Sequence, residues 1–275
     1  MADPFKINSP TCISFSGGRT SAYMLWRVLQ SNGGLPDEAI VCFSNTGKEE
    51  EATLRFVRDC GLNWNVPITW VEFRDDEKKY AVVDFDTASR HGEPFEAIIR
   101  KRQYLPNPVT RFCTIEMKIR PMARHLLNLG LGENMDQCEN MSMIGMRADE
   151  PMRCAKIADK SRIPLWSAGI GVGDVQTFWA MQPFNLELPT YKGRTLAGNC
   201  DLCFLKPANQ IQTLISEKPE RADWWAAMEA LALASKPSGA VFRSDRRSYA
   251  AMKKNADEQT DFIGFDEAIP CFCGD

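Results

Sequence analysis

Short apolar runs alternate with segments of helical spacing along the first half of this 275-residue chain, and this alternation limits how the chain can fold. Strands and helices in alternation predict a parallel, doubly wound α/β sheet. Because each crossover is right-handed, the loops that follow the strands meet at one edge and share one ligand. The expected strands are 11–15, 39–43, 68–73 and 141–145, and the expected helices are 20–30, 49–60 and 115–129.

The pattern changes after Pro164 to helices and irregular segments that are rich in Trp and Pro. We therefore expect two domains, an α/β domain over residues 1–165 and a smaller helical, cysteine-bearing cap over residues 166–275. The expected helices of the cap are 172–181, 208–217 and 222–234. Glycines mark the expected ends of the first two helices, namely Gly33 with Gly34, and Gly61.

The segment 14–21 leads from the first expected strand into the first expected helix. The N-terminus of a helix attracts anions, and Ser16, Thr20 and Ser21 add hydroxyl donors while Arg19 adds a charged fork. The segment therefore predicts a phosphate-binding loop, with an ordinary strand-to-helix turn as the alternative.

Gly17 and Gly18 lie at the centre of this loop. Glycine permits positive φ and a close approach of the backbone to a ligand. We expect Gly17→Val to abolish nucleotide binding and to leave the fold intact, because a Cβ atom there would collide with the phosphate.

Three further segments bring polar or cationic groups to the same edge of the sheet. Cations beside a phosphate loop would neutralise a polyphosphate or a pyrophosphate leaving group, and an acidic residue there could hold Mg²⁺. For the second loop the alternative is a helix cap made by Thr46 with Glu49. For the third segment it is a plain amphipathic helix, and for the fourth it is a capped turn. The candidates are Asn45, Thr46 and Gly47 in the second loop, Arg111, Lys118 and Arg120 in the third, and Gly145, Arg147 and Asp149 in the fourth.

Ten cysteines are many for a chain with only two histidines, and some of them are expected to bind a metal. Cys200 and Cys203 form a Cys-x-x-Cys pair, whose remaining ligands would come from Cys113, Cys271 or Cys273. Wide and irregular spacing favours a [4Fe–4S] cluster, and zinc held by the two close pairs is the alternative. The tail cysteines could instead be reactive thiols, and Cys12, Cys42 and Cys60 are expected to be small buried side chains.

The formal net charge is −3, so contact with nucleic acid would depend on a local basic patch. The candidates are residues 100–102 and 243–247. No apolar run approaches the length of a membrane span, and no secretory leader is recognised at the N-terminus, so we expect a cytoplasmic protein without membrane contact.

Ser-Phe-Ser-Gly-Gly-Arg-Thr-Ser at 14–21, Ser-Asn-Thr-Gly-Lys-Glu at 44–49, and Cys113 with Lys118 and Pro121 resemble the phosphoadenosine phosphosulfate (PAPS) reductase family. This family belongs to the PP-loop adenine-nucleotide α-hydrolase group. The resemblance covers about residues 1–165, and the segment 198–206 is similar to a branch found in bacteria and phages. It implies a Rossmann-like sheet that binds ATP or a sulfonucleotide (PAPS or adenosine phosphosulfate, APS), with the loop from Ser14 on holding the distal phosphates or sulfate.

Two departures from the family pattern matter. ATP-using relatives usually carry Lys-Asp where this chain has Arg19 and Thr20, so a carboxylate for Mg²⁺ must come from elsewhere, with Asp149 as the candidate. The assimilatory reductases carry Glu-Cys-Gly-Leu-His near the C-terminus, whereas this chain ends in Cys271-Phe-Cys273-Gly-Asp.

The favoured hypothesis is a sulfurtransferase that activates its substrate with an adenine nucleotide, assisted by an iron–sulfur cluster. Catalytic roles fall to Arg19, Lys118, Asp149 and Cys273. The alternatives are a sulfonucleotide reductase that uses a tail cysteine, and a non-catalytic nucleotide- or nucleic-acid-binding module with structural zinc. A nucleic acid, tRNA or DNA, is a candidate sulfur acceptor, and a homodimer is the expected assembly.

Overall fold

The computed structural model describes residues 3–191, 194–235 and 240–262. The chain forms two compact units, one made of Met1–Lys101 with Arg111–Asp201 and the other of Arg102–Thr110 with Leu202–Asp275. Residues 166–201, which the sequence pattern groups with the cap, thus belong to the first unit.

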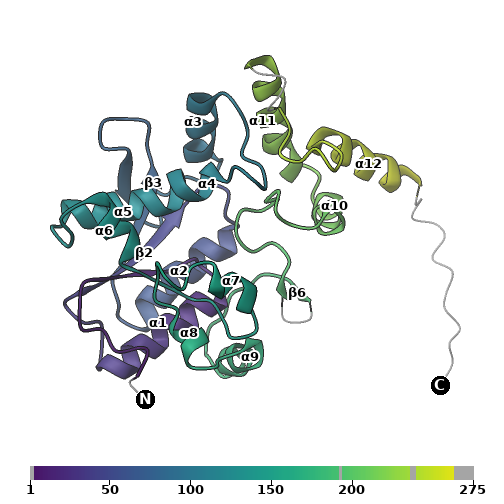
Figure 1. Cartoon of the computed structure of the whole chain (residues 1–275). Helices are drawn as coiled ribbons and strands as arrows, with labels where there is room; N and C mark the ends of the chain where they lie inside the picture. The colour runs from purple at the N-terminus through teal and green to yellow at the C-terminus, as the bar shows by residue number, and fades with distance from the viewer. Residues whose placement is uncertain (1–2, 192–193, 236–239, 263–275) are drawn as a thin grey trace, which may run out of the picture. The chain divides into compact units, whose positions relative to one another are not determined.

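A five-stranded sheet is the centre of the first unit (Figure 1). Its strands are β1 (Thr11–Ser14), β2 (Ala39–Asn45), β3 (Ile68–Phe73), β4 (Tyr80–Val83) and β5 (Ser142–Ile144), in the order β4-β3-β2-β1-β5. All neighbours are parallel except β4, which pairs antiparallel with β3 at the edge. The expected α/β fold is therefore confirmed. The chain builds outward from β1 to β4 and then returns to place β5 beside β1, which makes the gap between β1 and β5 the topological switch point.

Helices of the first unit cover the sheet and surround its carboxyl edge. They are α1 (Arg19–Asn32), α2 (Glu51–Asn63), α3 (Glu93–Arg102), α4 (Phe112–Thr114), a π-helical turn η1 (Ile115–Ile119), α5 (Arg120–Asn128), α6 (Met135–Asn140), α7 (Pro151–Ala155), α8 (Pro164–Ser167) and α9 (Val172–Ala180). A two-stranded hairpin pairs β6 (Thr190–Tyr191) with β7 (Arg194–Thr195).

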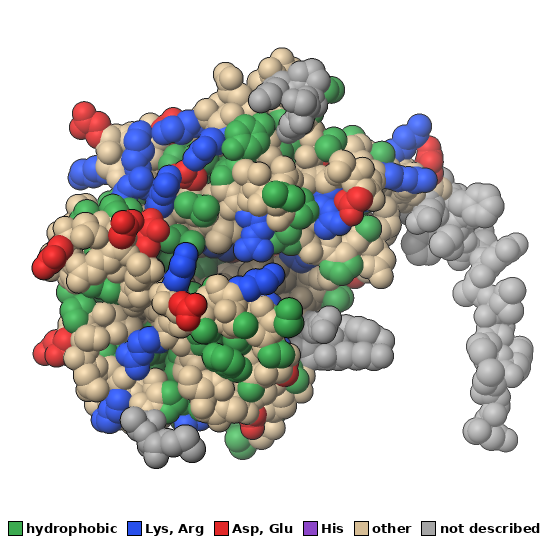
Figure 2. Space-filling view, in the orientation of Figure 1, with side chains coloured by type: hydrophobic (Ala, Val, Ile, Leu, Met, Phe, Trp, Pro, Cys, Tyr) green, Lys and Arg blue, Asp and Glu red, His purple; other side chains and the backbone are tan. Residues whose placement is uncertain are grey.

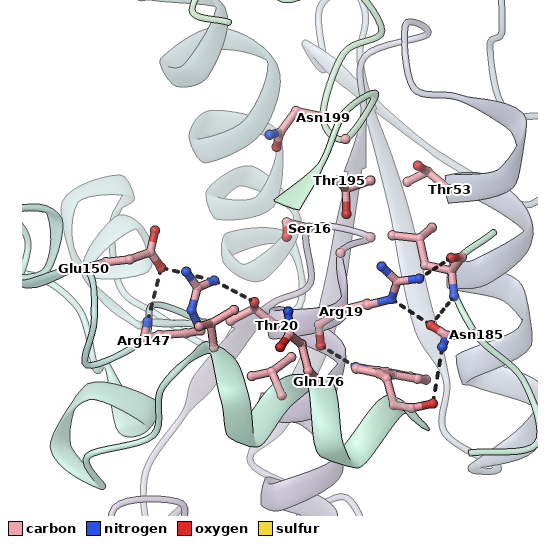
Figure 3. Close-up of a pocket in the computed structure, with 18 of the residues that line it drawn as sticks. Ser16, Arg19, Thr20, Thr53, Arg147, Glu150, Gln176, Asn185, Thr195 and Asn199 are labelled. Carbon is pink, nitrogen blue, oxygen red and sulfur yellow. Dashed lines mark hydrogen bonds and ion pairs between the residues drawn. The ribbon is translucent and has the colours of Figure 1, made fainter. Parts of the chain in front are cut away.

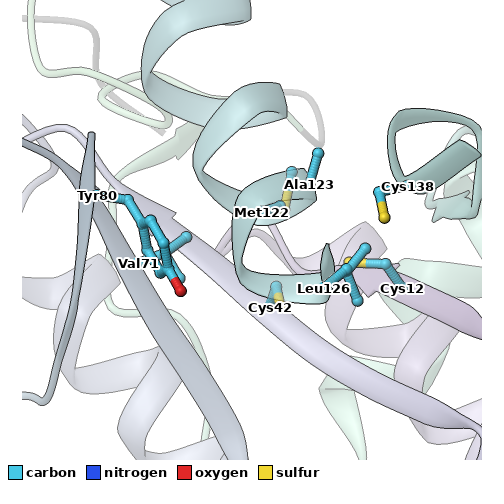
Figure 4. Close-up of a cluster of buried hydrophobic side chains, with 8 residues drawn as sticks. All are labelled: Cys12, Cys42, Val71, Tyr80, Met122, Ala123, Leu126 and Cys138. Atoms are coloured by element: carbon cyan, nitrogen blue, oxygen red, sulfur yellow. The ribbon is translucent and has the colours of Figure 1, made fainter. Parts of the chain in front are cut away.

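One face of the sheet packs against α5 and α6 through a closed hydrophobic cluster (Figure 4). Side chains alternate along a strand, so Cys12, Cys42 and Val71 share this face. They meet Leu126 of α5 and Cys138 of α6. A hydrogen bond with Cys12, together with burial, raises the pKa of the Cys42 thiol. These cysteines act as small apolar side chains, as expected for Cys12 and Cys42.

An aromatic layer joins α9 to α1 and α2. The Trp179 ring lies 5.0 Å from that of Phe56 on α2, and the Phe178 ring lies 4.7 Å from that of Trp26 on α1, measured between centroids. Aromatic side chains of this size contribute much of the apolar area buried in a core. This packing explains why the chain after Pro164 is part of the first unit.

The expected helix 115–129 is present but is divided into α4, η1 and α5. Pro121 lies in the first turn of α5 and has no N–H to donate to the preceding turn. The wider π-helical turn accommodates this missing hydrogen bond, and such turns are frequent at functional sites.

The two expected helix ends have different outcomes. Gly33 ends α1 with φ of 73° and donates its N–H to Leu29, as expected. Gly61 lies inside α2, which continues to Asn63, so the expected end at Gly61 is wrong. A Cβ atom at Gly61 would lie 3.3 Å from the Val66 carbonyl oxygen, so the glycine serves close packing instead.

The described part of the second unit contains the helices α10 (Ala208–Glu217), α11 (Arg221–Ser235) and α12 (Tyr249–Phe262). α10 and α11 lie close to the expected helices 208–217 and 222–234, whereas the sequence pattern predicted no helix at the position of α12. The core of this unit is aromatic. Trp225 stacks on Tyr249 with 5.2 Å between centroids, and Phe204 stacks on Phe242 at 5.6 Å. The Tyr249 hydroxyl donates to the Leu202 carbonyl (2.7 Å), which ties the start of the unit to α12. Within the described residues, no helix is both long and apolar enough to cross a membrane.

Candidate functional site

A cavity of about 810 Å³ lies in the first unit at the switch point between β1 and β5 (Figure 3). Open α/β sheets bind their ligands at this position. Five stretches of chain line the cavity: residues 16–20, 145–153, 172–186 and 195–199, and Thr53 of α2. Eight of the candidate residues are among them, namely Ser16, Gly17, Gly18, Arg19, Thr20, Gly145, Arg147 and Asp149.

The glycine turn at the start of α1 exposes backbone donors to the cavity. Gly17 has φ of 73°, and Gly18 is the N-cap of α1 without a side-chain capping bond. The N–H groups of the first helical turn lack intrahelical acceptors, and the helix dipole adds positive potential there. The turn therefore has the features of an anion site.

Ser21 stabilises this turn through two hydrogen bonds to its backbone. Its hydroxyl accepts from the Ser16 N–H (3.1 Å) and donates to the Gly18 carbonyl (2.9 Å). Ser21 is buried and Ser14 is the last residue of β1, and neither lines the cavity. Of the loop hydroxyls, those of Ser16 and Thr20 face the ligand space.

Gly17 is required by the protein interior, which overturns the expectation for Gly17→Val. A Cβ atom on Gly17 would lie 2.6 Å from Thr53 Cγ2 and 3.2 Å from both Phe43 and Val57. The substitution would therefore disturb the fold, so the expected intact fold is wrong. Gly18 is different, because its Cβ would meet only the Ser16 hydroxyl, at 3.7 Å.

Gly145 also serves packing. A Cβ atom there would lie 2.9 Å from the Ser21 Cα atom, closer than side chains tolerate. The glycine lets the loop after β5 rest on the start of α1, and so sets the width of the cavity at this point.

Arg19 lines the cavity, but its guanidinium group holds a neighbouring segment. Its Nε donates to Asn185 Oδ1 and its Nη2 to the Leu186 carbonyl, both at 2.7 Å (Figure 3). The indole of Trp179 donates to the Arg19 carbonyl (2.9 Å), and Asn185 donates to the Trp179 carbonyl (3.2 Å). Burial lowers the pKa of Arg19. In the described structure Arg19 thus connects the start of α1 to the chain that follows α9.

Arg147 carries positive charge to the other side of the glycine turn. Its Nη1 donates to the Thr20 hydroxyl (3.2 Å), and its Nε and Nη2 donate to Asp149 at 2.9 and 3.0 Å. The hydrogen bond to Asp149 raises the pKa of Arg147 and lowers that of Asp149. Glu150 lies 3.6 Å from Arg147 and also pairs with Arg153. Mg²⁺ at Asp149 stays a prediction, and the ion would have to share this carboxylate with Arg147.

The second loop lies outside the cavity lining. Asn45 is buried and donates to Glu72 (2.5 Å) and to the Ser89 carbonyl (2.8 Å). A Cβ atom on Gly47 would lie 3.0 Å from the Gly92 nitrogen. Both residues therefore have structural partners that account for their presence.

Thr46 is fully buried and bonds to the Glu49 carboxylate through its N–H and its hydroxyl, each at 2.9 Å. The expected pairing of these two residues is present, yet it does not cap the helix. α2 begins at Glu51 with Glu50 as its N-cap, so the expected cap is wrong. The pairing closes the loop before the helix.

The cationic segment also lies outside the cavity lining. Arg111 precedes α4, and Lys118 lies in η1, where the Ser44 hydroxyl donates to its carbonyl (3.3 Å). Arg120 forms an ion pair with the buried Glu116 (2.6 Å). These cations are therefore brought together on the α4-η1-α5 segment rather than on the glycine turn.

The described cysteine candidates come from different segments of the chain. Cys113 is half-buried in α4. Cys200 is buried with its sulfur 3.3 Å from the Thr46 hydroxyl, and Lys48 pairs with the adjacent Asp201 (3.2 Å). Cys203 belongs to the second unit.

Cys271 and Cys273 lie outside the described residues. Over residues 3–191, 194–235 and 240–262, no three metal-binding side chains come together. The cluster and its ligand set thus stay a prediction.

Several lining residues have no counterpart in the sequence prediction. Most come from the stretch 172–199, which the sequence pattern placed in the cap, and only packing brings it to β1. Thr53 lies on a helix, where no motif distinguishes it. These residues are Thr53, Val172, Val175, Gln176, Trp179, Ala180, Asn185, Leu186, Thr195 and Asn199.

No family model matches the chain. A comparison with curated proteins finds 30% identity over 207 residues with the "Uncharacterized nin region protein ORF290" of Escherichia phage lambda. The similar stretch covers 72% of this chain and 67% of the phage protein.

Proposed function

The chain belongs to the family of the phage lambda nin region protein ORF290, and for this member we propose an adenine-nucleotide-dependent sulfur-transfer enzyme of the PAPS reductase type. The supporting observation is the glycine turn of Gly17 and Gly18, which opens the uncapped start of α1 to a large cavity at the switch point. That arrangement suits the phosphate groups of a nucleotide.

The cavity lining contains both polar donors and apolar side chains, which suit the phosphate and base ends of a nucleotide. The glycine turn and Arg147 provide backbone N–H groups and positive charge. Arginine is charged over the physiological range, and the hydrogen bond to Asp149 raises the pKa of Arg147 further. The apolar side chains of Val172, Val175 and Leu186 also line the cavity and can contact an adenine ring.

The proposed reaction has two steps. An oxygen atom of the acceptor attacks the α-phosphorus of ATP, the bond to the bridging oxygen breaks, and pyrophosphate leaves. A sulfide-level sulfur then attacks the activated carbon, and AMP leaves with the acceptor's oxygen. The glycine turn would hold the phosphates, and Arg147 would offset the charge that builds up on the pyrophosphate.

A [4Fe–4S] cluster remains part of the proposal on the Cys-x-x-Cys pair alone. The described residues hold Cys200 in a buried position and gather no three-ligand group, so no step above depends on a cluster. Cys271 and Cys273 are the remaining candidate ligands, and zinc is the alternative metal.

Nucleotide binding is tested by titrating the full-length protein with ATP, PAPS and APS in a calorimeter. We expect binding by the wild type and, for Gly18→Val, affinity about tenfold weaker or more with an unchanged fold, because Gly18 lines the cavity and an added Cβ atom would meet only the Ser16 hydroxyl, at 3.7 Å. Wild-type protein that binds none of the three nucleotides would remove the proposal.

Turnover distinguishes the two enzyme hypotheses. Pyrophosphate release from ATP supports sulfur transfer after adenylylation. Thiol-dependent sulfite release from PAPS or APS supports the sulfonucleotide reductase, in which Cys271 or Cys273 would attack the sulfur atom and the nucleotide would leave.

Binding to nucleic acid is a second candidate function, favoured by the charge of residues 96–101 and 111–124 of the first unit. Together these residues include six basic and two acidic side chains, in a chain of net charge −3. Figure 2 shows Lys and Arg side chains gathered over the region where Figure 1 draws α3, α4 and α5. Such a surface suits a phosphate backbone.

Binding of a tRNA or a DNA duplex is measured at several salt concentrations. We expect the double substitution Arg100→Gln with Arg111→Gln to weaken binding and to reduce the salt slope by about 2, roughly one per lost phosphate contact. Lys254→Gln on α12, an exposed cation far along the chain, is the matched control. Equal binding by all three proteins would exclude this surface.

A further inference from the structure

Thr53 is a buried polar residue in the cavity wall whose hydroxyl group is unused. The side chain lies in the first turns of α2 and is 2% exposed. Its Oγ1 is buried and has no hydrogen-bond partner among the described residues, and Thr53 is one of the residues that line the cavity beside the glycine turn (Figure 3). A hydroxyl in this position either forms a hydrogen bond with a ligand or lowers the stability of the folded protein.

The free-energy cost of the unsatisfied Thr53 hydroxyl argues against a purely structural role for this residue. A threonine in a helix commonly bonds its hydroxyl to a carbonyl of the preceding turn, and Thr53 does not. Leaving a buried hydroxyl unsatisfied is destabilising, whereas valine has nearly the same shape and carries no such penalty. Packing alone would therefore favour valine at this position.

The position of Thr53 is fixed relative to the anion turn. Its methyl group is the nearest neighbour of a Cβ atom on Gly17, at 2.6 Å, so the absent side chain of Gly17 makes room for Thr53. Figure 3 shows Thr53 and Thr195 on one side of the turn and Arg147 with Glu150 on the other. Thr53 thus offers an uncharged donor opposite the charged one.

We propose that Thr53 is a ligand-contacting residue that donates a hydrogen bond to an oxygen of the tetrahedral oxyanion held at Gly17 and Gly18. This inference rests on the proposed function, because the oxyanion is a phosphate of ATP or the sulfate group of a sulfonucleotide. Both groups present the same acceptor oxygens, and Thr53 contacts whichever group occupies the turn.

The experiment compares the full-length wild type with Thr53→Val and Thr53→Ser, each titrated separately with ATP, APS and PAPS. Without ligand, we expect Thr53→Val to melt at or above the wild-type temperature, because an unsatisfied hydroxyl is removed. Its affinity should fall about tenfold for the nucleotide that the wild type binds, and Thr53→Ser should retain affinity within about threefold. Thr53→Ala provides a second hydroxyl-free variant and should show the same loss.

The outcomes separate the two proposals. Binding by the wild type with equal affinity in Thr53→Val and Thr53→Ala would overturn the role of Thr53 and leave the proposed function standing. A lower melting temperature for Thr53→Val with unchanged affinity would overturn it as well, because the hydroxyl would then serve the fold. Wild-type protein that binds none of the three nucleotides would instead overturn the proposed function itself.

Discussion

Gly17 and Gly18 are adjacent but have different surroundings, and the difference is measurable. We expect Gly17→Ala to lower the free energy of unfolding, by about 1–2 kcal/mol for the positive φ and about 1–3 kcal/mol for overpacking against Thr53. Gly18→Ala is the matched control and should cost less than about 1 kcal/mol, because φ is −108° and space is open. Urea denaturation of both variants tests this, and equal losses would contradict it.

The same residues show what a sequence reveals about a site. Glycines and hydroxyl residues after a strand are visible in the sequence, and Ser16 to Thr20 do line the cavity. Burial is not visible. Asn45 is polar enough to contact a ligand, yet its side-chain amide donates to Glu72 and to the Ser89 carbonyl instead. Thr53 looks like any helical threonine, although it reaches the cavity.

At the scale of elements, α11 and α12 are joined by a buried carboxylate that makes the stability of the second unit depend on pH. Glu229 accepts from the Tyr249 N–H (2.9 Å), and burial raises its pKa although Arg246 opposes the shift. A raised pKa in the folded state gives stability that is present below about pH 4.3, the ordinary glutamate pKa, and is lost as pH rises through the folded pKa.

Glu229→Gln keeps the acceptor oxygen and removes the charge, so it isolates this effect. We expect the melting temperature of the wild type, relative to that of Glu229→Gln, to fall as the pH rises from 4 to 8. Thermal melts of both proteins across this range provide the measurement. A constant difference between the two curves would show that Glu229 does not titrate differently on folding.

The loop after β5 depends on contact with α1. We expect Gly145→Ala to destabilise the protein by about 1–3 kcal/mol, because the added carbon would lie 2.9 Å from the Ser21 backbone. Gly173→Ala in α9 is the control, since a Cβ atom there has no described neighbour within 4 Å. A similar melting temperature for both variants would contradict the assigned role of Gly145.

Strands and helices were largely predictable because apolar spacing is a local property. The strand 68–73 and the helix 208–217 match the observed elements, and the other expected elements shift by a few residues. The sequence pattern did not predict β4, β6, β7, α3, α6, α7, α8 or α12. The π-helical turn was not predictable, because it reflects how Pro121 and the sheet together shape the chain. The membership of α9 in the first unit depends on aromatic contacts with α1 and α2 that no local pattern encodes.

At the scale of the whole molecule, the metal hypothesis predicts a property of the purified protein. We expect protein purified without oxygen to be brown, with absorbance near about 400 nm and bound iron. Cys200→Ala should lose the colour and the iron, whereas Cys60→Ala, which changes a buried cysteine inside α2, should keep both. Metal analysis decides the matter, and a colourless wild type with one zinc per chain would exclude iron.

The hydrogen bonds of Arg19 couple ligand binding to the position of residues 185–186. In the described hydrogen bonds, the Nε and Nη2 atoms of the Arg19 guanidinium group donate to Asn185 and Leu186. An oxyanion that accepts from the same two nitrogens must compete with Asn185 and Leu186. Binding of the oxyanion and release of residues 185–186 are then one coupled equilibrium. By thermodynamic reciprocity, a second binding event that weakens the contacts of Arg19 with residues 185–186 would also raise the affinity for the oxyanion.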